Sequence, residues 1–106
     1  MKRDNELDLG RFTEPALLIL VSLADGPKHG YAMIEDIRRL AGATLGAGTL
    51  YGALARLERL GHIEALASRD RRVPYRLTAS GRVLLQAHLA GLRRLTAAGI
   101  RRLARA

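Results

Sequence analysis

The sequence predicts a mainly helical fold that carries one small β-hairpin and ends in a long helix. Three observations support this prediction. Apolar residues make up 48% of the 106 residues but aromatic residues only 4%, so the core is expected to consist of aliphatic side chains on helices. Four segments show apolar residues at helical spacing. One further segment has a charged tip between two extended stretches, and the length fits a single domain.

The first two helices are delimited by capping and breaking residues. Thr13 is predicted to cap a helix that runs to about residue 24 and ends at the breakers Asp25–Pro27. The second helix is predicted over about residues 29–41, with Gly42 as its stop. The residues expected to face the core from these helices are Leu17, Leu18, Leu20, Val21, Ala24, Met33, Ile34, Ile37 and Leu40.

The third helix, about residues 49–60, is predicted to bury one side and to expose an unusually small outer side. Residues 43–45 before it form either a short strand or a loop. Gly61 is a natural residue to follow the helix end. The inward positions are Leu50, Ala53, Leu54 and Leu57, and the outward positions are Gly48, Gly52, Ala55 and Arg59.

A hairpin and a last helix complete the chain. Strands are predicted at residues 62–68 and 73–77, and the tip Arg69–Arg72 between them is basic. Thr78 is predicted to cap the last helix. We therefore divide the chain into an N-terminal arm (residues 1–12), a domain of three helices and a hairpin (residues 13–78) and a C-terminal helix (residues 79–106).

The order helix, helix, short strand, helix, hairpin, helix is typical of a winged helix-turn-helix with an added helix. In such a unit the third helix enters the major groove of DNA, and the hairpin, or wing, reaches a neighbouring phosphate row. The alternative interpretation is that the exposed residues of the third helix and of the wing are solvated and contact no DNA. The residues predicted to contact double-stranded DNA are Lys28, Tyr31, Gly48, Thr49, Tyr51, Gly52, Arg56, Arg59, Arg69, Arg71 and Arg72.

The charge distribution favours a polyanionic partner. The chain carries a net charge of +8, and residues 69–106 hold ten arginines but one aspartate. A field of this sign attracts nucleic acid first and an anionic membrane surface second. RNA is disfavoured because no aromatic platform for stacking bases is present.

The start of the second helix allows two interpretations. Lys28 and the free backbone donors of the helix can lie against a DNA phosphate. Alternatively, His29 caps the helix and Tyr31 packs between helices. We favour the cap for His29 and leave Tyr31 open.

Several classes of function are disfavoured by what the sequence lacks. Without cysteine there is no disulfide, thiolate metal site or cysteine nucleophile, and a reducing, cytoplasmic location is expected. The longest apolar run, residues 16–21, is too short to span a membrane. The histidines at 29, 62 and 88 lie on separate elements without metal-ligand spacing, and no phosphate-binding glycine loop is present. We therefore expect no enzyme activity, no cofactor and no metal.

The chain resembles the PadR-like family of winged-helix transcriptional regulators. The resemblance spans about residues 14–89 and depends on five segments in order, together with Gly81: Gly26–Tyr31 (GPKHGY), Gly48–Tyr51 (GTLY), Ala53–Leu54, Arg56–Glu58 and Tyr75–Thr78 (YRLT). It implies a repressor that dimerises through its C-terminal helix and is often released from DNA by a small hydrophobic or aromatic effector. The lack of aromatic residues after Tyr75 argues against a ring-stacking pocket in the last helix.

The chain departs from the family pattern in the third helix and in the wing. Family members commonly carry proline where this chain has Gly52 and lysine where it has Ala55, so one expected donor is absent. The segment before Arg76 is reduced to Pro74–Tyr75, and the wing loop is short. The departures in the third helix are expected to alter base contacts, and those in the wing are expected to alter how the wing docks on DNA.

The last helix carries leucines at three- and four-residue spacing. They either pack on a partner helix or fold back on their own domain, and we favour the partner. The leucines predicted at a dimer interface are Leu85, Leu89, Leu92 and Leu103. The resulting hypothesis is a homodimer that binds a palindromic operator and represses transcription. The competing hypothesis is a winged helix that binds a protein and no DNA.

Overall fold

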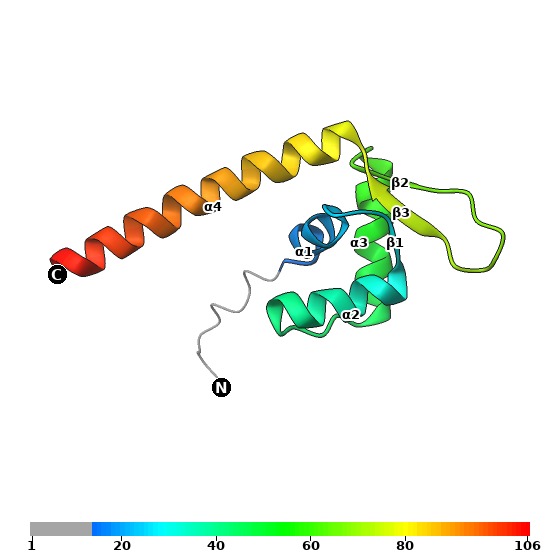
Figure 1. The fold of residues 1–106 in the computed structure, drawn as a ribbon, viewed down its shortest axis with the longest axis horizontal. Helices are drawn as coiled ribbons and strands as arrows, with labels where there is room; N and C mark the ends of the chain where they lie inside the picture. Colours follow the sequence, from blue (N-terminus) through cyan, green and yellow to red (C-terminus); the bar gives the residue numbers. More distant parts are fainter. Residues whose placement is uncertain (1–13) are drawn as a thin grey trace.

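The computed structural model describes residues 14–106 and has four helices and three short strands in that range (Figure 1). The elements are α1 (Pro15–Leu23), β1 (Lys28–His29), α2 (Gly30–Ala41), α3 (Ala47–Arg59), β2 (Ile63–Ala65), β3 (Pro74–Leu77) and α4 (Ala79–Arg105). The predicted arm and Thr13 lie outside the described residues.

The core lies where α1 meets α2, α3 and the base of α4. The nine residues of α1 are almost all apolar, and this helix is buried on several sides, as such a composition requires. Aliphatic side chains fill the core, as predicted. The buried hydrophobic residues are Leu18, Ile19, Leu20, Leu23, Met33, Ile37, Leu50, Ala53, Leu54, Leu57, Ile63, Leu77 and Leu85.

The strands form an antiparallel sheet in the order β1-β3-β2. Lys28 pairs with Tyr75 in β1 and β3, and Ile63 pairs with Leu77 in β2 and β3. Of the two structures left open for residues 43–45, the loop is correct, and the short strand instead precedes α2. A two-residue strand has no periodicity of its own, and only its pairing with β3 defines it.

The helix ends confirm most of the predicted caps. Nδ1 of His29 accepts a hydrogen bond from the Ala32 N–H at 3.3 Å, and Oγ1 of Thr78 accepts one from the Gly81 N–H at 3.1 Å. Gly42 ends α2 with a φ of 67°, a left-handed conformation that favours glycine. The N-cap of α1 is Glu14, whose side chain makes no capping hydrogen bond.

Three predicted positions on the helices are corrected. Ala24 was expected in the core but is exposed, because α1 ends at Leu23 and Ala24 is its C-cap residue. Leu40 was expected in the core but is 57% exposed, because it lies in the last turn of α2, where residues 38–41 are all exposed. Leu85 was expected to contact a partner subunit, but it is only 5% exposed and lies in the core of its own domain. The domain therefore extends one turn further along α4 than the leucine spacing indicated.

The hairpin and the free end of α4 project in opposite directions (Figure 1). Both strands of the hairpin are shorter than predicted, although the Leu66 N–H still donates to the Pro74 carbonyl at 2.8 Å beyond β2. Beyond Leu85, most residues of α4 are exposed. The fold is thus a winged helix with a long helix that extends away from the wing.

Candidate nucleic-acid interface

One side of α3 is open to solvent over its whole length. Leu50, Ala53, Leu54 and Leu57 are buried, whereas Gly48, Thr49, Tyr51, Gly52, Ala55, Arg56 and Arg59 are exposed. This is the predicted division of the helix into an inner and an outer side. Because the outer side carries two glycines and an alanine, the backbone of α3 can approach another molecule closely.

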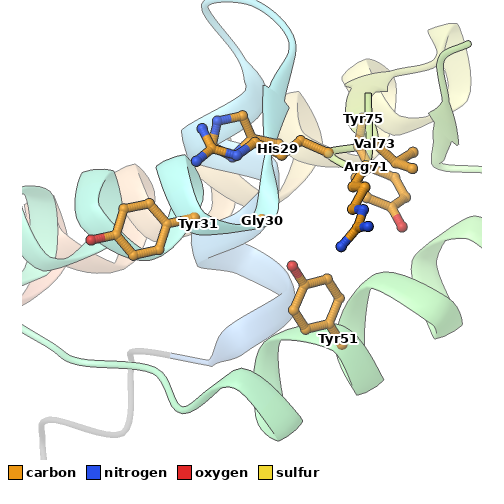
Figure 2. A pocket seen from close by; sticks show the side chains of 8 residues that line it. His29, Gly30, Tyr31, Tyr51, Arg71, Val73 and Tyr75 are labelled. Atoms are coloured by element: carbon orange, nitrogen blue, oxygen red, sulfur yellow. The ribbon is translucent and has the colours of Figure 1, made fainter. Parts of the chain in front are cut away.

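A cavity of about 220 Å³ lies between the start of α2, the exposed side of α3 and the wing (Figure 2). We call it the wing cavity. Its lining residues are His29, Gly30, Tyr31, Tyr51, Arg71, Arg72, Val73 and Tyr75. All three tyrosines of the chain therefore contribute to one cavity, together with two wing arginines.

Tyr51 links the two helices that border the wing cavity. Figure 2 shows its hydroxyl directed at Gly30, the first residue of α2. An ideal Cβ at Gly30 would overlap the Tyr51 hydroxyl oxygen and would lie 2.8 Å from its Cζ atom. The Tyr51 ring can occupy this position because Gly30 has no side chain.

The other two tyrosines differ in their surroundings. Tyr31 is 64% exposed, and Figure 2 shows its ring directed away from Tyr51, so it does not pack between helices. Tyr75 is partly buried against the core, and burial raises the pKa of its phenol. Tyr31 is therefore available to a ligand, whereas Tyr75 supports the floor of the cavity.

The wing tip is organised around Asp70. Its carboxylate accepts hydrogen bonds from the Arg72 N–H at 2.9 Å and from the Ser68 hydroxyl at 3.0 Å. These two donors hold the pKa of Asp70 below its ordinary value, the backbone N–H contributing most. Within residues 14–106, the guanidinium groups of Arg69, Arg71 and Arg72 form no ion pair. Asp70 thus shapes the turn and leaves the arginines for an external anion.

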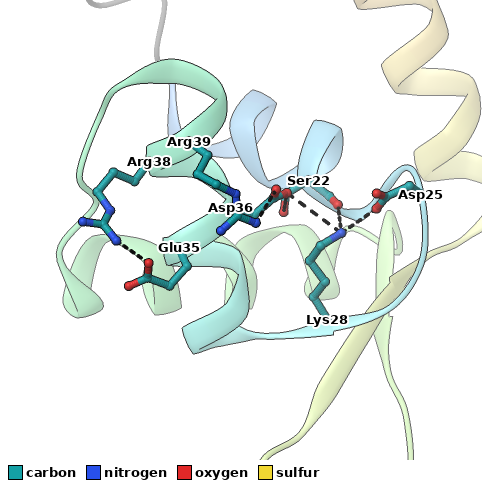
Figure 3. A network of polar contacts seen from close by, with 7 residues as sticks. All are labelled: Ser22, Asp25, Lys28, Glu35, Asp36, Arg38 and Arg39. Atoms are coloured by element: carbon teal, nitrogen blue, oxygen red, sulfur yellow. Dashed lines mark hydrogen bonds and ion pairs between the residues drawn. The ribbon is translucent and has the colours of Figure 1, made fainter.

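Lys28 does not belong to this surface, which corrects its predicted role. Its ammonium donates to the Ser22 carbonyl and to the Asp25 carboxylate and lies 3.9 Å from Asp36 (Figure 3). Asp36 also accepts a hydrogen bond from the buried Ser22 hydroxyl at 2.7 Å. The Lys28 side chain is only 19% exposed. It joins the end of α1 to α2 and is not free to reach a phosphate.

Replacing Lys28 by methionine is therefore expected to affect folding. Lys28→Met keeps the aliphatic stem but removes the donor to the Ser22 carbonyl, so we expect the free energy of unfolding to fall by about 1 kcal/mol. Urea denaturation followed by circular dichroism measures this. Arg38→Met is a matched control, because within residues 14–106 the sole ion pair of Arg38 is with Glu35 on its own helix surface. Equal stability of the Lys28 variant and the wild type would contradict the structural role.

The sequence missed part of this site. The structure brings Tyr31, Tyr51, Arg71 and Arg72 to the wing cavity and leaves Gly48, Thr49, Gly52, Arg56 and Arg59 along the open side of α3. Arg69 lies exposed in the wing outside the cavity lining. Val73 and Tyr75 also line the cavity but were predicted only as strand residues. The tyrosine content is the sequence signal that could have indicated the cavity. The chain has few aromatic residues, and three of them are tyrosines, so a shared site for the tyrosines could have been considered.

Comparison with known proteins decides the family. Residues 19–87 match the PadR-like family of transcriptional regulators. The chain belongs to this family. A protein of 37.1 kDa in transposon Tn4556 of Streptomyces fradiae, described as uncharacterized, is 43% identical over 86 residues, which are 81% of this chain. The chain spans only 25% of the length of that relative.

Solved structures of PadR-like and related regulators share the fold. A PadR family transcription regulator from Clostridium difficile is 26% identical, with a TM-score of 0.74 over 79% of this chain and 92% of its own. A transcriptional regulator from Clostridium thermocellum is 29% identical, with a TM-score of 0.75 over 92% of this chain and 96% of its own. The second comparison includes most of α4, so the long helix is part of the shared fold.

In residues 14–106 no helix has the length and apolar character needed to cross a lipid bilayer. Nor does this range contain a group of three or more side chains suited to holding a metal ion.

Proposed function

We propose that this transcriptional regulator binds duplex DNA in a sequence-specific manner, with α3 in the major groove. The observation that carries the proposal is the open side of α3, where small residues alternate with Thr49, Arg56 and Arg59. A major groove is about 12 Å wide and admits one helix, and arginine pairs with the N7 and O6 atoms of guanine. Within residues 14–106 neither Arg56 nor Arg59 pairs with an acidic side chain, so both can donate to bases.

We propose that the wing cavity binds a phosphate of the DNA backbone. The free N–H groups at the start of α2 are positively polarised, and Arg71 and Arg72 approach from the wing. Tyr51 adds a hydroxyl group on the α3 side of the cavity, whereas Tyr31 lines the cavity but has its ring directed away from Tyr51. Phosphate contacts of this kind fix the position of a protein on the duplex, whereas base contacts give specificity.

A second copy of the chain is the proposed partner of α4. Leu89 is 44% exposed, Leu103 is 78% exposed, and Leu92 is partly exposed, so all three are accessible to a partner helix and remain the proposed interface residues. Pairing of two such helices would bury this stripe, as in a coiled coil. The dimer would present two α3 helices to a palindromic operator about one helical turn apart and would repress transcription by occupying a promoter.

The family resemblance also suggests a small hydrophobic effector. A second cavity of about 220 Å³ between α1 and α4 is lined by Leu17, Leu92, Leu95 and Thr96. Its lining is mostly aliphatic, which suits an apolar ligand better than one held by ring stacking. Because Leu92 also belongs to the proposed dimer interface, such a ligand would act on the dimer.

Selection of bound duplexes from random DNA at low and at moderate salt tests the function. We expect an enriched palindromic sequence and an affinity that falls steeply with salt. An absence of enrichment together with salt-independent behaviour would instead favour the protein-binding module, in which α3 contacts a protein.

Arg71→Ala is expected to weaken binding to all duplexes alike. Loss of one phosphate contact should lower the slope of log affinity against log salt by about 0.9. Fluorescence anisotropy at several salt concentrations measures the slope on a selected and on a random duplex. Lys28→Met is the control, and its slope should match the wild type. A loss confined to the selected duplex would contradict the assignment of Arg71 to the backbone.

A further inference from the structure

We propose that His62 and Ser80 are positioning residues that fix the direction of α4 relative to α3 and thereby set the operator half-site spacing that the protein prefers. This rests on the function proposed above, because it assumes that two copies pair through α4. The evidence is a polar junction between the α3–β2 turn and the first turn of α4. We call it the α4 junction and define it by Gly61, His62, Thr78, Ser80 and Gly81.

Two hydroxyl groups converge on one carbonyl in the α4 junction. The Gly61 carbonyl accepts a hydrogen bond from Oγ1 of Thr78 at 2.6 Å and another from Oγ of Ser80 at 3.1 Å. A carbonyl oxygen has two lone pairs, so both of its acceptor positions are used. Gly61 has a φ of 82°, and this left-handed turn places the carbonyl where both hydroxyls reach it.

His62 completes the junction and takes a defined role in it. Its Nδ1 atom lies 2.9 Å from Oγ of Ser80. When the Ser80 hydroxyl donates to the Gly61 carbonyl, the His62 tautomer that carries its proton on Nδ1 donates to Ser80. The His62 ring therefore holds Ser80 against the turn, and each hydrogen bond supports the next.

Capping of α4 does not require Ser80. Oγ1 of Thr78 accepts from the Gly81 N–H and so caps the N-terminus of α4, whereas the hydroxyl of Ser80 makes hydrogen bonds to the α3–β2 turn. On the neighbouring side, Gly81 lies so close to the His62 carbonyl that a Cβ would overlap it. Leu85, one turn later, is held in the core. The base of α4 is thus fixed at three points, while most of the helix beyond it is exposed.

The length of α4 amplifies any change at this base. From Gly81 to Arg105 the helix extends about 36 Å at ~1.5 Å per residue, so a rotation of about 10° at the junction moves its far end by about 6 Å. Successive base pairs are about 3.4 Å apart along the duplex axis. A small loss of rigidity at the junction would therefore let a dimer accept half-sites shifted by about two base pairs.

The first test measures the direction of α4 without DNA. The chain has no cysteine, so Ala41→Cys on α2 and Ala104→Cys near the end of α4 give two specific attachment sites for spin labels. Labelled protein is diluted with unlabelled protein so that only distances within one copy are recorded. We expect a narrow distance distribution for the wild-type background and a broader one for His62→Ala/Ser80→Ala. Thr44→Ala, which removes an exposed hydroxyl in the α2–α3 loop, is the control. Equal widths for all three would overturn the proposal.

The second test measures spacing preference on duplexes that carry the same half-sites with spacers lengthened or shortened by single base pairs. The ratio of the affinity for the best spacer to the affinity for its neighbours should fall about fivefold in His62→Ala/Ser80→Ala, which removes two exposed hydrogen bonds of modest net value. Binding to an isolated half-site should not change. A retained preference would overturn the spacing role. Failure of the wild type to bind any duplex would instead refute the proposed function, and the label distances would still decide whether the junction directs α4.

Discussion

Gly81→Ala is expected to lower the free energy of unfolding by about 3 kcal/mol or more. An ideal Cβ at Gly81 would overlap the carbonyl oxygen of His62 and lie 2.9 Å from its carbonyl carbon. These are backbone atoms of the α3–β2 turn, so they cannot swing away as a flexible side chain can. Relief requires a shift of α4 or of the turn, which disturbs the hydrogen bonds that both make. Thermal and urea denaturation measure the loss.

Gly52→Ala provides the matched control for this prediction. Gly52 also lies inside a helix, but nothing stands within 4 Å of its ideal Cβ. Alanine there should raise the free energy of unfolding by about 0.5–1 kcal/mol, because glycine lowers helix stability. If both variants changed stability in the same direction, the close approach at Gly81 would not explain its effect. The added methyl group at position 52 should nevertheless weaken DNA binding, since it lies on the open side of α3.

Arg56→Ala is expected to reduce affinity for the selected operator about 10- to 100-fold while changing affinity for random DNA little. A bidentate contact between arginine and guanine contributes about 1–3 kcal/mol of discrimination, and it is lost only where the correct base is present. Competition between operator and random duplexes, followed by anisotropy, measures the ratio of the two affinities.

Arg93→Ala is the control for Arg56→Ala. Arg93 is exposed on α4, away from α3, and its loss removes one positive charge without touching the proposed reading surface. Comparable losses for Arg56→Ala and Arg93→Ala on every duplex would mean that net charge alone governs binding. In that case α3 would not read bases.

Local patterns predicted most of the fold. The helical spacing of Leu50, Ala53, Leu54 and Leu57 is a property of one segment, so the buried and open sides of α3 could be assigned from the sequence. The same holds for Gly42 and Thr78, because capping involves neighbours within a few residues.

Features that depend on distant contacts were predicted less well. Strand β1 exists only because β3 pairs with it, and the pattern of two residues could not indicate this. The spacing of Leu85 and Leu89 predicts a stripe on α4 but not the point at which the domain core ends. Lys28 looked like a phosphate ligand by its position, yet the nearby acids Asp25 and Asp36 determine where its ammonium lies. Tertiary packing decided each of these cases.

The contact between Gly30 and Tyr51 constrains how this sequence can diverge. Any larger residue at position 30 would collide with the phenol, which would have to rotate or be replaced. The Tyr51 ring can therefore keep the orientation that lines the wing cavity only while residue 30 is glycine. A lineage that acquires alanine or serine at 30 keeps the fold but has to turn the residue at 51 away from α2, which changes the shape of that cavity.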